Sequence, residues 1–153
     1  GNDDWDNEPI TKNAVDLMRS ISKWQIIFGG NYFELPPTKC WLVWDKDNGQ
    51  SDQTDCELAW ANFRSVVRQF TKASEKSNRV HPTQKPVKLY EWLLTNYAEK
   101  GQKILDTHLG SDSHAIACNN LGFELIATEL DKDYFDAACN RITQESAQLR
   151  MFA

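Results

Sequence analysis

The sequence predicts an α/β fold, in which helices alternate with short apolar strands along most of the chain. Two observations lead to this fold class. The C-terminal third follows the order strand, turn, helix, strand, helix, which is typical of a parallel βαβα unit with a right-handed crossover. The composition is that of an ordinary globular protein, with 41% hydrophobic and 25% charged residues among 153. Collagen-like and largely disordered classes are therefore excluded.

The first half of the chain is expected to form one helix and three strands. Residues 13–22 carry apolar side chains at helical spacing. Residues 24–28 and 40–44 are short apolar runs bounded by turn-forming residues, which indicates buried strands. Residues 56–63 indicate a third strand, although two alanines leave a helix open. Three tryptophans of the first two strands are expected in the core: Trp24, Trp41 and Trp44.

The second half is expected to hold the βαβα unit. Residues 64–85 show no strong periodicity. A helix is expected over 86–97, because proline suits the first helical position, and Lys85 would then be the N-cap. The elements expected after Gly101 are a strand over 103–106, a helix over 113–121, a strand over 123–129 and a helix over 132–149.

No feature of the sequence indicates a membrane-bound or secreted protein. The apolar runs are far shorter than the ~20 residues of a spanning helix, and the first residues lack the pattern of a signal peptide. The four cysteines form no close pair, so neither a zinc knuckle nor a CxxC redox site is indicated. The three histidines have no metal-ligand spacing. We expect a cytoplasmic protein without a metal.

A strand that ends in an acid, followed by a turn of small residues, marks the first candidate site. The strand ends at Asp106, and the turn through Gly110 leads into the helix that begins at Ser113. In doubly wound sheets, ligands bind at the carboxyl ends of the strands, where such turns present backbone N–H groups. The next strand ends at Glu129, about where an acid would bind ribose hydroxyls. An ordinary turn, with Asp131 merely capping the last helix, explains the same residues equally well.

The second candidate site is the His-Pro-Thr-Gln-Lys-Pro segment at residues 81–86. Two prolines restrict the backbone around three polar side chains. Lys85 takes an expected N-cap position where Ser, Thr, Asp or Asn is preferred. This lysine is a candidate anion clamp, and the alternative is a solvated lysine on a rigid surface turn.

Together, these two segments resemble the β-group of S-adenosylmethionine-dependent DNA amino-methyltransferases, which modify adenine N6 or cytosine N4. The resemblance includes residues 81–86, 104–110 and 129–135, and it extends back to 29–33 and 41–46. It implies a Rossmann-like methyltransferase sheet with flanking helices and a circularly permuted order of motifs. One domain over 1–153 would comprise catalytic-half strands and a helix (1–63), a basic DNA-contacting segment (64–85) and a cofactor-binding half (86–153).

The resemblance also implies which residues hold S-adenosylmethionine. The loop around the methionine part would include Asp106, Thr107, Gly110, Ser111, Asp112 and Ser113. Glu129 would bind the ribose, with Asp131 and Tyr134 beside the adenosine end. Thr83 and Lys85 would hold the carboxylate of the cofactor, in agreement with the anion-clamp interpretation.

The chain departs from the family pattern in two places. Asp112 replaces an expected glycine, and its negative charge is expected to weaken cofactor binding unless it caps the helix. The catalytic tetrapeptide Asp/Asn/Ser-Pro-Pro-aromatic does not occur, so no catalytic residue is assigned. In the family this tetrapeptide follows a central strand, and the chain is therefore expected to lack at least one central strand. Three explanations of the missing strand are open. The chain is a fragment, the strand comes from another chain or a second copy, or the strands re-pair around the deletion.

The overall charge of −5 conceals one basic segment. Residues 64–88 hold seven lysines and arginines against one acid. The residues expected to contact double-stranded DNA are Arg64, Arg68, Lys72, Lys76 and Arg79.

The function that the family resemblance implies is methyl transfer to the amino group of a flipped base, with adenine N6 preferred. The alternatives are an inactive or fragmentary module that binds cofactor or DNA without transfer, and a plain nucleotide-binding or protein-interaction domain.

Overall fold

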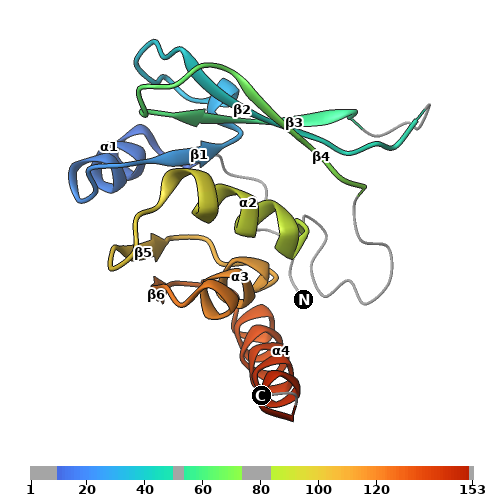
Figure 1. Cartoon of the computed structure of the whole chain (residues 1–153). Helices are drawn as coiled ribbons and strands as arrows, with labels where there is room; N and C mark the ends of the chain where they lie inside the picture. The colour runs from blue at the N-terminus through green and yellow to red at the C-terminus, as the bar shows by residue number, and fades with distance from the viewer. Residues whose placement is uncertain (1–9, 50–53, 74–83, 152–153) are drawn as a thin grey trace. The chain divides into compact units, whose positions relative to one another are not determined.

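A computed structural model describes residues 10–49, 54–73 and 84–151. The chain divides into two compact units. The first comprises Gly1–Trp44 and Cys56–Gln69, and the second comprises Asp45–Asp55 and Phe70–Ala153. Both units contain helices and strands, which confirms the α/β class (Figure 1).

The first unit contains helix α1 and most of a four-stranded sheet. Helix α1 spans Lys12–Ser20, and the hydroxyl of Thr11 caps it by accepting a hydrogen bond from the N–H of Ala14 at 3.3 Å. The strands lie in the order β1-β3-β2-β4, and the boundary between the units falls inside β2 and β4. Their bounds are Ile26–Phe28 for β1, Cys40–Asp45 for β2, Cys56–Ala61 for β3 and Arg68–Thr71 for β4.

Alternation of side chains and a close glycine contact shape this sheet. Cys40, Leu42 and Trp44 of β2 are buried, while the residues between them are half-buried. After β1 the chain turns into the short 3₁₀ helix η2, which spans Gly30–Tyr32. A Cβ atom on Gly30 would lie 2.5 Å from the Cβ of Trp60, so the turn can approach β3 because position 30 has no side chain.

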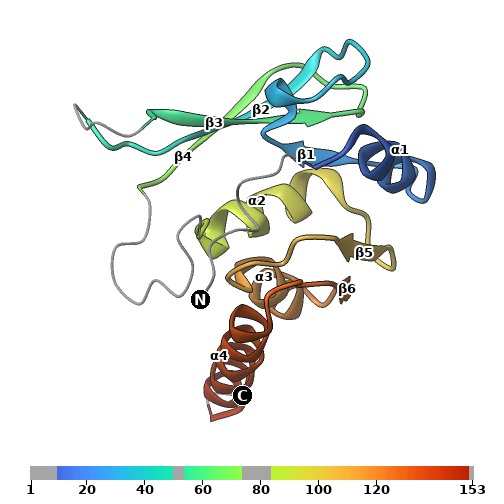
Figure 2. The same ribbon diagram turned by 180° about the vertical axis from the view of Figure 1, so that it is seen from behind.

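The second unit contains a parallel pair of strands and three described helices (Figure 2). Strands β5 and β6 pair in parallel, from Lys103 opposite Glu124 to Asp106 opposite Ala127. The βαβα unit that the sequence predicts is therefore present. The bounds are Val87–Tyr97 for α2, Lys103–Asp106 for β5, Ser113–Leu121 for α3, Glu124–Ala127 for β6 and Lys132–Met151 for α4.

The core of this unit lies where α2, α3 and the parallel strands meet. Leu94, Ala117 and Cys118 are buried there, and Ile104 and Leu125 pack against them from β5 and β6. Helices α2 and α3 lie side by side in Figure 1 and Figure 2. This packing holds the carboxyl ends of β5 and β6 next to the first turn of α3.

One strand lies where the sequence shows no periodicity, and two expectations, about Lys85 and Trp24, are wrong. Residues 68–71 form β4 within the segment that shows no periodicity, because four residues are too few to reveal an alternation. The N-cap of α2 is Pro86 rather than Lys85, because Pro86 keeps an extended ψ of 141°. Trp24 lies outside β1 and is 43% exposed, and its ring stacks on Phe63 with ring centroids 5.1 Å apart.

The six described strands form two sheets, whereas the resemblance implies one. In the sheet assignment, β5 pairs with β6 and with none of β1 to β4. The permuted order of motifs stays a prediction. Among the described residues, no helix has the length and apolar character needed to cross a membrane.

Candidate functional site

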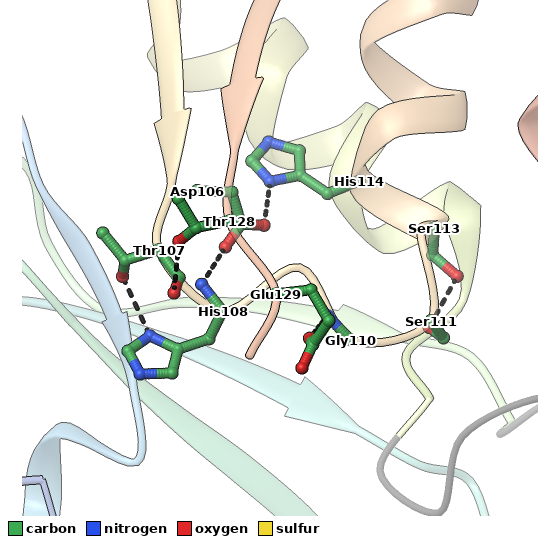
Figure 3. A network of polar contacts seen from close by, with 9 residues as sticks. All are labelled: Asp106, Thr107, His108, Gly110, Ser111, Ser113, His114, Thr128 and Glu129. Carbon is green, nitrogen blue, oxygen red and sulfur yellow. Dashed lines mark hydrogen bonds and ion pairs between the residues drawn. The ribbon is translucent and has the colours of Figure 1, made fainter. Parts of the chain in front are cut away.

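The candidate site is the loop between β5 and α3, and it begins at the half-buried acid Asp106 (Figure 3). Oδ1 of Asp106 accepts a hydrogen bond from the N–H of His108 at 2.9 Å. Oδ2 lies 2.7 Å from Nδ1 of His114, in the first turn of α3. Burial raises the pKa of Asp106, but the contacts with His114 and the His108 N–H outweigh it and hold the pKa below its ordinary value. Asp106, as an ionised carboxylate, therefore connects the start of the loop at His108 to the first turn of α3 at His114.

The His114 ring is held by a second contact. The ring of Tyr90, from α2, stacks on it with centroids 4.7 Å apart and an interplanar angle of 12°. The stacking and the Asp106 contact together connect α2, β5 and α3. The sequence analysis did not select His114. The available signal was a histidine in the first turn of the helix that follows the strand-end acid.

The end of β6 holds the other side of the loop. Thr128 donates from its N–H to the carbonyl of Asp106 at 2.9 Å and from its hydroxyl to the carbonyl of Thr107 at 2.9 Å. The carbonyl of Thr128 accepts from the N–H of Leu109 at 3.0 Å. These backbone contacts extend the parallel pairing past the ends of the strands and restrict the loop through Leu109.

Glu129 bridges the loop and the start of α4. Its Oε2 accepts from the N–H of Gly110 at 2.8 Å, and its Oε1 accepts from the N–H of Asp131 at 3.0 Å. Oδ1 of Asp131 in turn accepts from the N–H groups of Asp133 and Tyr134, at 2.8 and 3.1 Å. Asp131 therefore caps α4, as the simpler sequence interpretation expects. The structure brings Glu129 and Gly110 together, as a nucleoside site at this turn requires.

Asp112 takes the backbone conformation that glycine favours. Its φ is +69°, in the left-handed region, and it occupies the N-cap of α3 without a side-chain cap hydrogen bond. Its side chain is 0% exposed, and Oδ1 lies 2.7 Å from Nη1 of Arg141, in α4. Nη1 of Arg141 also donates to the carbonyl of Ser111 at 3.1 Å.

The contacts of Asp112 differ from those that the sequence suggests. The sequence analysis expects its negative charge to weaken cofactor binding unless it caps the helix, and the effect on binding stays a prediction. The carboxylate is instead buried and ion-paired, and it makes no cap hydrogen bond. Arg141 is 29 residues further along the chain, and no local pattern links the two positions.

The remaining loop residues lie where the sequence places them. Ser111 and Ser113 are buried at the start of α3, with their hydroxyl oxygens 3.4 Å apart. Thr107 is half-buried, and its hydroxyl lies 2.9 Å from Nδ1 of His108. Tyr134 is half-buried in the first turn of α4.

The segment that precedes α2 is described only in part. Thr83 lies outside the described residues. Lys85 is half-buried and comes directly before Pro86, the N-cap of α2. Gln84 is buried, with 3% of its surface exposed.

The basic segment is also described in part. Arg64 and Arg68 are exposed, and Arg68 begins β4. Lys72 is half-buried, and its N–H donates to the carbonyl of Asp45 at 2.9 Å. Lys76 and Arg79 lie outside the described residues.

Comparison with known proteins gives a family match and partial relatives. A family model described as DNA methylase, N6_N4_Mtase, matches residues 8–140. The type II methyltransferase M.HpaI of Haemophilus parainfluenzae is 33% identical over 70 residues, which are 46% of this chain and 22% of M.HpaI. The type II methyltransferase M2.DpnII of Streptococcus pneumoniae is 34% identical over 77 residues, 50% of this chain and 29% of M2.DpnII. The matched segments span less than a third of either relative.

Solved structures resemble the fold. M1.HpyAVI in its SAM complex has a TM-score of 0.57 and 27% identity, over 67% of this chain and 60% of M1.HpyAVI. The Thermus thermophilus protein TTHA0409 has a TM-score of 0.50 and 17% identity, over 90% of this chain and 61% of that protein, a likeness of fold alone. Since the family model covers most of the chain and the whole β5–α3–β6 site, this chain belongs to the DNA methylase family of N6 and N4 methyltransferases.

Proposed function

We propose that this chain forms the cofactor-binding part of a DNA amino-methyltransferase and binds S-adenosylmethionine at the carboxyl ends of β5 and β6. The observation that carries the proposal is the 2.8 Å hydrogen bond from the N–H of Gly110 to Oε2 of Glu129. It brings a glycine turn and an acid at the tip of the next parallel strand to the same edge of the sheet. Ligands of doubly wound folds bind at that edge.

Glu129 suits the ribose of the cofactor. Each of its oxygens accepts one backbone N–H, and a carboxylate has about four acceptor positions in all. The remaining positions can accept hydrogen bonds from two vicinal hydroxyls. The backbone contacts meanwhile hold the carboxylate in one orientation, which lowers the entropic cost of binding. Asp131 and Tyr134, which follow in the first turn of α4, would border the adenosine.

The methionine end of the cofactor carries a carboxylate and an ammonium group. Ser111 and Ser113 supply hydroxyls at the start of α3, where the helix dipole favours negative charge. Lys85 would provide a cation for the carboxylate together with Thr83. Asp106, Thr107 and Asp112 would shape the loop. When bound, S-adenosylmethionine supplies the methyl group, and these side chains orient it.

We further propose that the substrate is double-stranded DNA and that the accepting atom is adenine N6. The exposed Arg64 and Arg68 support phosphate contacts by the basic segment of the sequence, in which Lys72, Lys76 and Arg79 carry further positive charge. The preference for adenine rests on the overall resemblance of the sequence. In the family mechanism the base leaves the duplex before its amino group is methylated.

A second candidate is a module that binds cofactor or DNA without transferring the methyl group. One observation favours it, because the 153 residues contain no Asp/Asn/Ser-Pro-Pro-aromatic tetrapeptide. The Pro-Pro pair of the chain, at positions 36 and 37, stands between Leu35 and Thr38. These two residues supply neither the polar first residue nor the aromatic last residue of the tetrapeptide. Without this segment, the chain has no group assigned to hold the target base.

Three measurements test the proposal and separate the candidates. Calorimetric titration of the chain with S-adenosylmethionine should show one saturable site, and absence of binding would overturn the cofactor assignment. Tritiated methyl transfer to unmethylated duplex DNA should occur if the chain is the catalytic enzyme. Binding without transfer would favour the second candidate. If transfer occurs, mass spectrometry of the digested nucleosides should show N6-methyladenine, and N4-methylcytosine would contradict the adenine assignment.

A further inference from the structure

We propose that Arg141 is a positioning residue for the loop between β5 and α3, and that it acts through the buried carboxylate of Asp112. This inference rests on the proposed function, because its consequence is a loop shaped for S-adenosylmethionine. Arg141 lies on α4 and would contribute no cofactor contact of its own. Its effect would come from the geometry that it imposes on the residues between Gly110 and Ser113.

The first argument is the conformation of the loop. Gly110 and Asp112 both have positive φ values, +58° and +69°. Glycine enters this region without strain, whereas aspartate does so at a cost in free energy. A side chain at position 112 therefore needs an interaction that stabilises the left-handed conformation. The ion pair with Arg141, at 2.7 Å from Oδ1 to Nη1, supplies that interaction.

The second argument is burial. Asp112 is 0% exposed and the side chain of Arg141 is 18% exposed, so solvent screens this pair far less than a surface pair. Removing one partner of a buried pair leaves the other charge without compensation, which is strongly unfavourable. The loop and α4 are therefore coupled, and a change in Arg141 should be transmitted to the backbone at Asp112.

The third argument is that the loop is held from two sides. On one side, Glu129 accepts the N–H of Gly110. On the other side, the same Nη1 that contacts Asp112 donates to the carbonyl of Ser111 at 3.1 Å. Arg141 thus contacts two consecutive residues immediately after Gly110. One NH₂ group of the planar guanidinium donates to both acceptors, and lysine would keep the charge but not this planar geometry.

The test is a set of variants at the two positions, measured by calorimetry with S-adenosylmethionine and by hydrogen exchange of the peptide that covers residues 107–116. R141M removes the cation, and D112G/R141M removes the pair while restoring a residue that adopts positive φ freely. K132M is the control, since it removes an exposed cation from the same helix without touching the loop. R141K tests whether the charge alone is sufficient.

We expect R141M to bind the cofactor about tenfold more weakly, as when the competent loop falls to about one tenth of the population. R141K should be intermediate, K132M should match the wild type, and D112G/R141M should recover most of the affinity. Wild-type affinity in R141M, or a double variant no better than R141M, would overturn the proposal. If R141M does not fold, D112G/R141M still decides the question, because wild-type affinity supports the inference and weak binding contradicts it.

Hydrogen exchange separates this inference from the proposed function. If the wild-type chain binds no S-adenosylmethionine, the proposed function fails. The positioning effect is still measurable, because R141M should lose amide protection over 107–116 and D112G/R141M should regain it. Unchanged protection in R141M would then overturn the inference.

Discussion

Nδ1 of His114 lies 2.7 Å from Oδ2 of Asp106, and this contact joins the first turn of α3 to the last residue of β5. The N–H of His108 occupies the other carboxylate oxygen, Oδ1, at 2.9 Å. The acid at the strand end is therefore an internal support of the candidate cofactor loop. Its protonation should determine whether the loop keeps its shape.

The first prediction concerns pH. The pKa of Asp106 is lowered, so its contribution to stability is present above the unfolded pKa of about 3.9 and is lost as the pH falls through the folded value. H114F keeps an aromatic ring against Tyr90 but removes the hydrogen bond to the ionised carboxylate, so the free energy of unfolding should be lower at every pH where Asp106 is ionised. We expect acid unfolding of H114F, followed by circular dichroism, to begin at a higher pH than in the wild type.

The control for this prediction is H108F. The charge of His108 is the weakest of the influences on the pKa of Asp106, and its backbone N–H survives the substitution. The acid midpoint of H108F should therefore stay close to that of the wild type. Equal midpoints for H114F and the wild type would show that His114 does not stabilise the ionised carboxylate.

The second prediction concerns the carboxylate at the tip of β6. E129Q replaces one oxygen by an NH₂ group, which cannot accept the N–H of Gly110 or of Asp131. An orphaned donor in this half-buried place costs about 1–3 kcal/mol. The NH₂ group also cannot accept hydrogen bonds from the ribose hydroxyls, so we expect the affinity for S-adenosylmethionine to fall about tenfold or more, where 1.4 kcal/mol corresponds to a factor of ten.

The matched control for E129Q lies on the same strand. Glu124 is exposed and pairs with Lys103 at 3.1 Å on the surface, so E124Q removes a carboxylate from β6 without disturbing the loop. Calorimetry should give E124Q the affinity of the wild type. Equal losses in both variants would mean that the effect is not specific to the ribose position.

The third prediction concerns the thiols. Burial raises the pKa of Cys118 to about 12, and it also raises the pKa of Cys40. Cys56 and Cys139 are exposed. Because the thiolate is the reactive form, iodoacetamide at pH 8 should modify Cys56 and Cys139 quickly in the folded protein. Peptide mass spectrometry should find Cys40 and Cys118 modified only after denaturation, and fast labelling of Cys118 would contradict the described core.

The fourth prediction concerns DNA. Replacement of Arg64, Arg68 and Lys72 by glutamine should flatten the dependence of log K on log salt concentration, by about 0.9 for each phosphate contact that is lost. A triple glutamine variant of the exposed Lys12, Lys100 and Lys103 carries the same change of charge outside the basic segment. Fluorescence anisotropy with a labelled duplex over a salt series measures both slopes. Equal slopes for the two variants would contradict the assignment of the basic segment to the DNA interface.

Local sequence patterns predicted the second unit more closely than the first. The strand at 103–106 and the helix at 113–121 match β5 and α3 residue for residue. Their ends are marked in the sequence by a strand-end acid, a glycine turn and Gly122 at the C-cap of α3. The first unit has short strands joined by irregular turns. Strand β4, which lies across the boundary of the two units, has too few residues to show periodicity. Trp24 lies outside β1, and its ring stacks on Phe63.

Local patterns in the sequence were sufficient to predict the α/β class, the βαβα unit and a candidate nucleoside site at Gly110 and Glu129. These features depend on the periodicity and spacing of residues that are close along the chain. The partners of the two acids in the loop follow from tertiary packing alone. Asp106 meets His114, and Asp112 meets Arg141 across 29 residues. Such pairs form because helices pack on strands and bury the charges, and burial makes an opposite charge or a donor obligatory. The charge that the sequence indicated as an obstacle to the cofactor is, in the folded chain, one end of a buried ion pair.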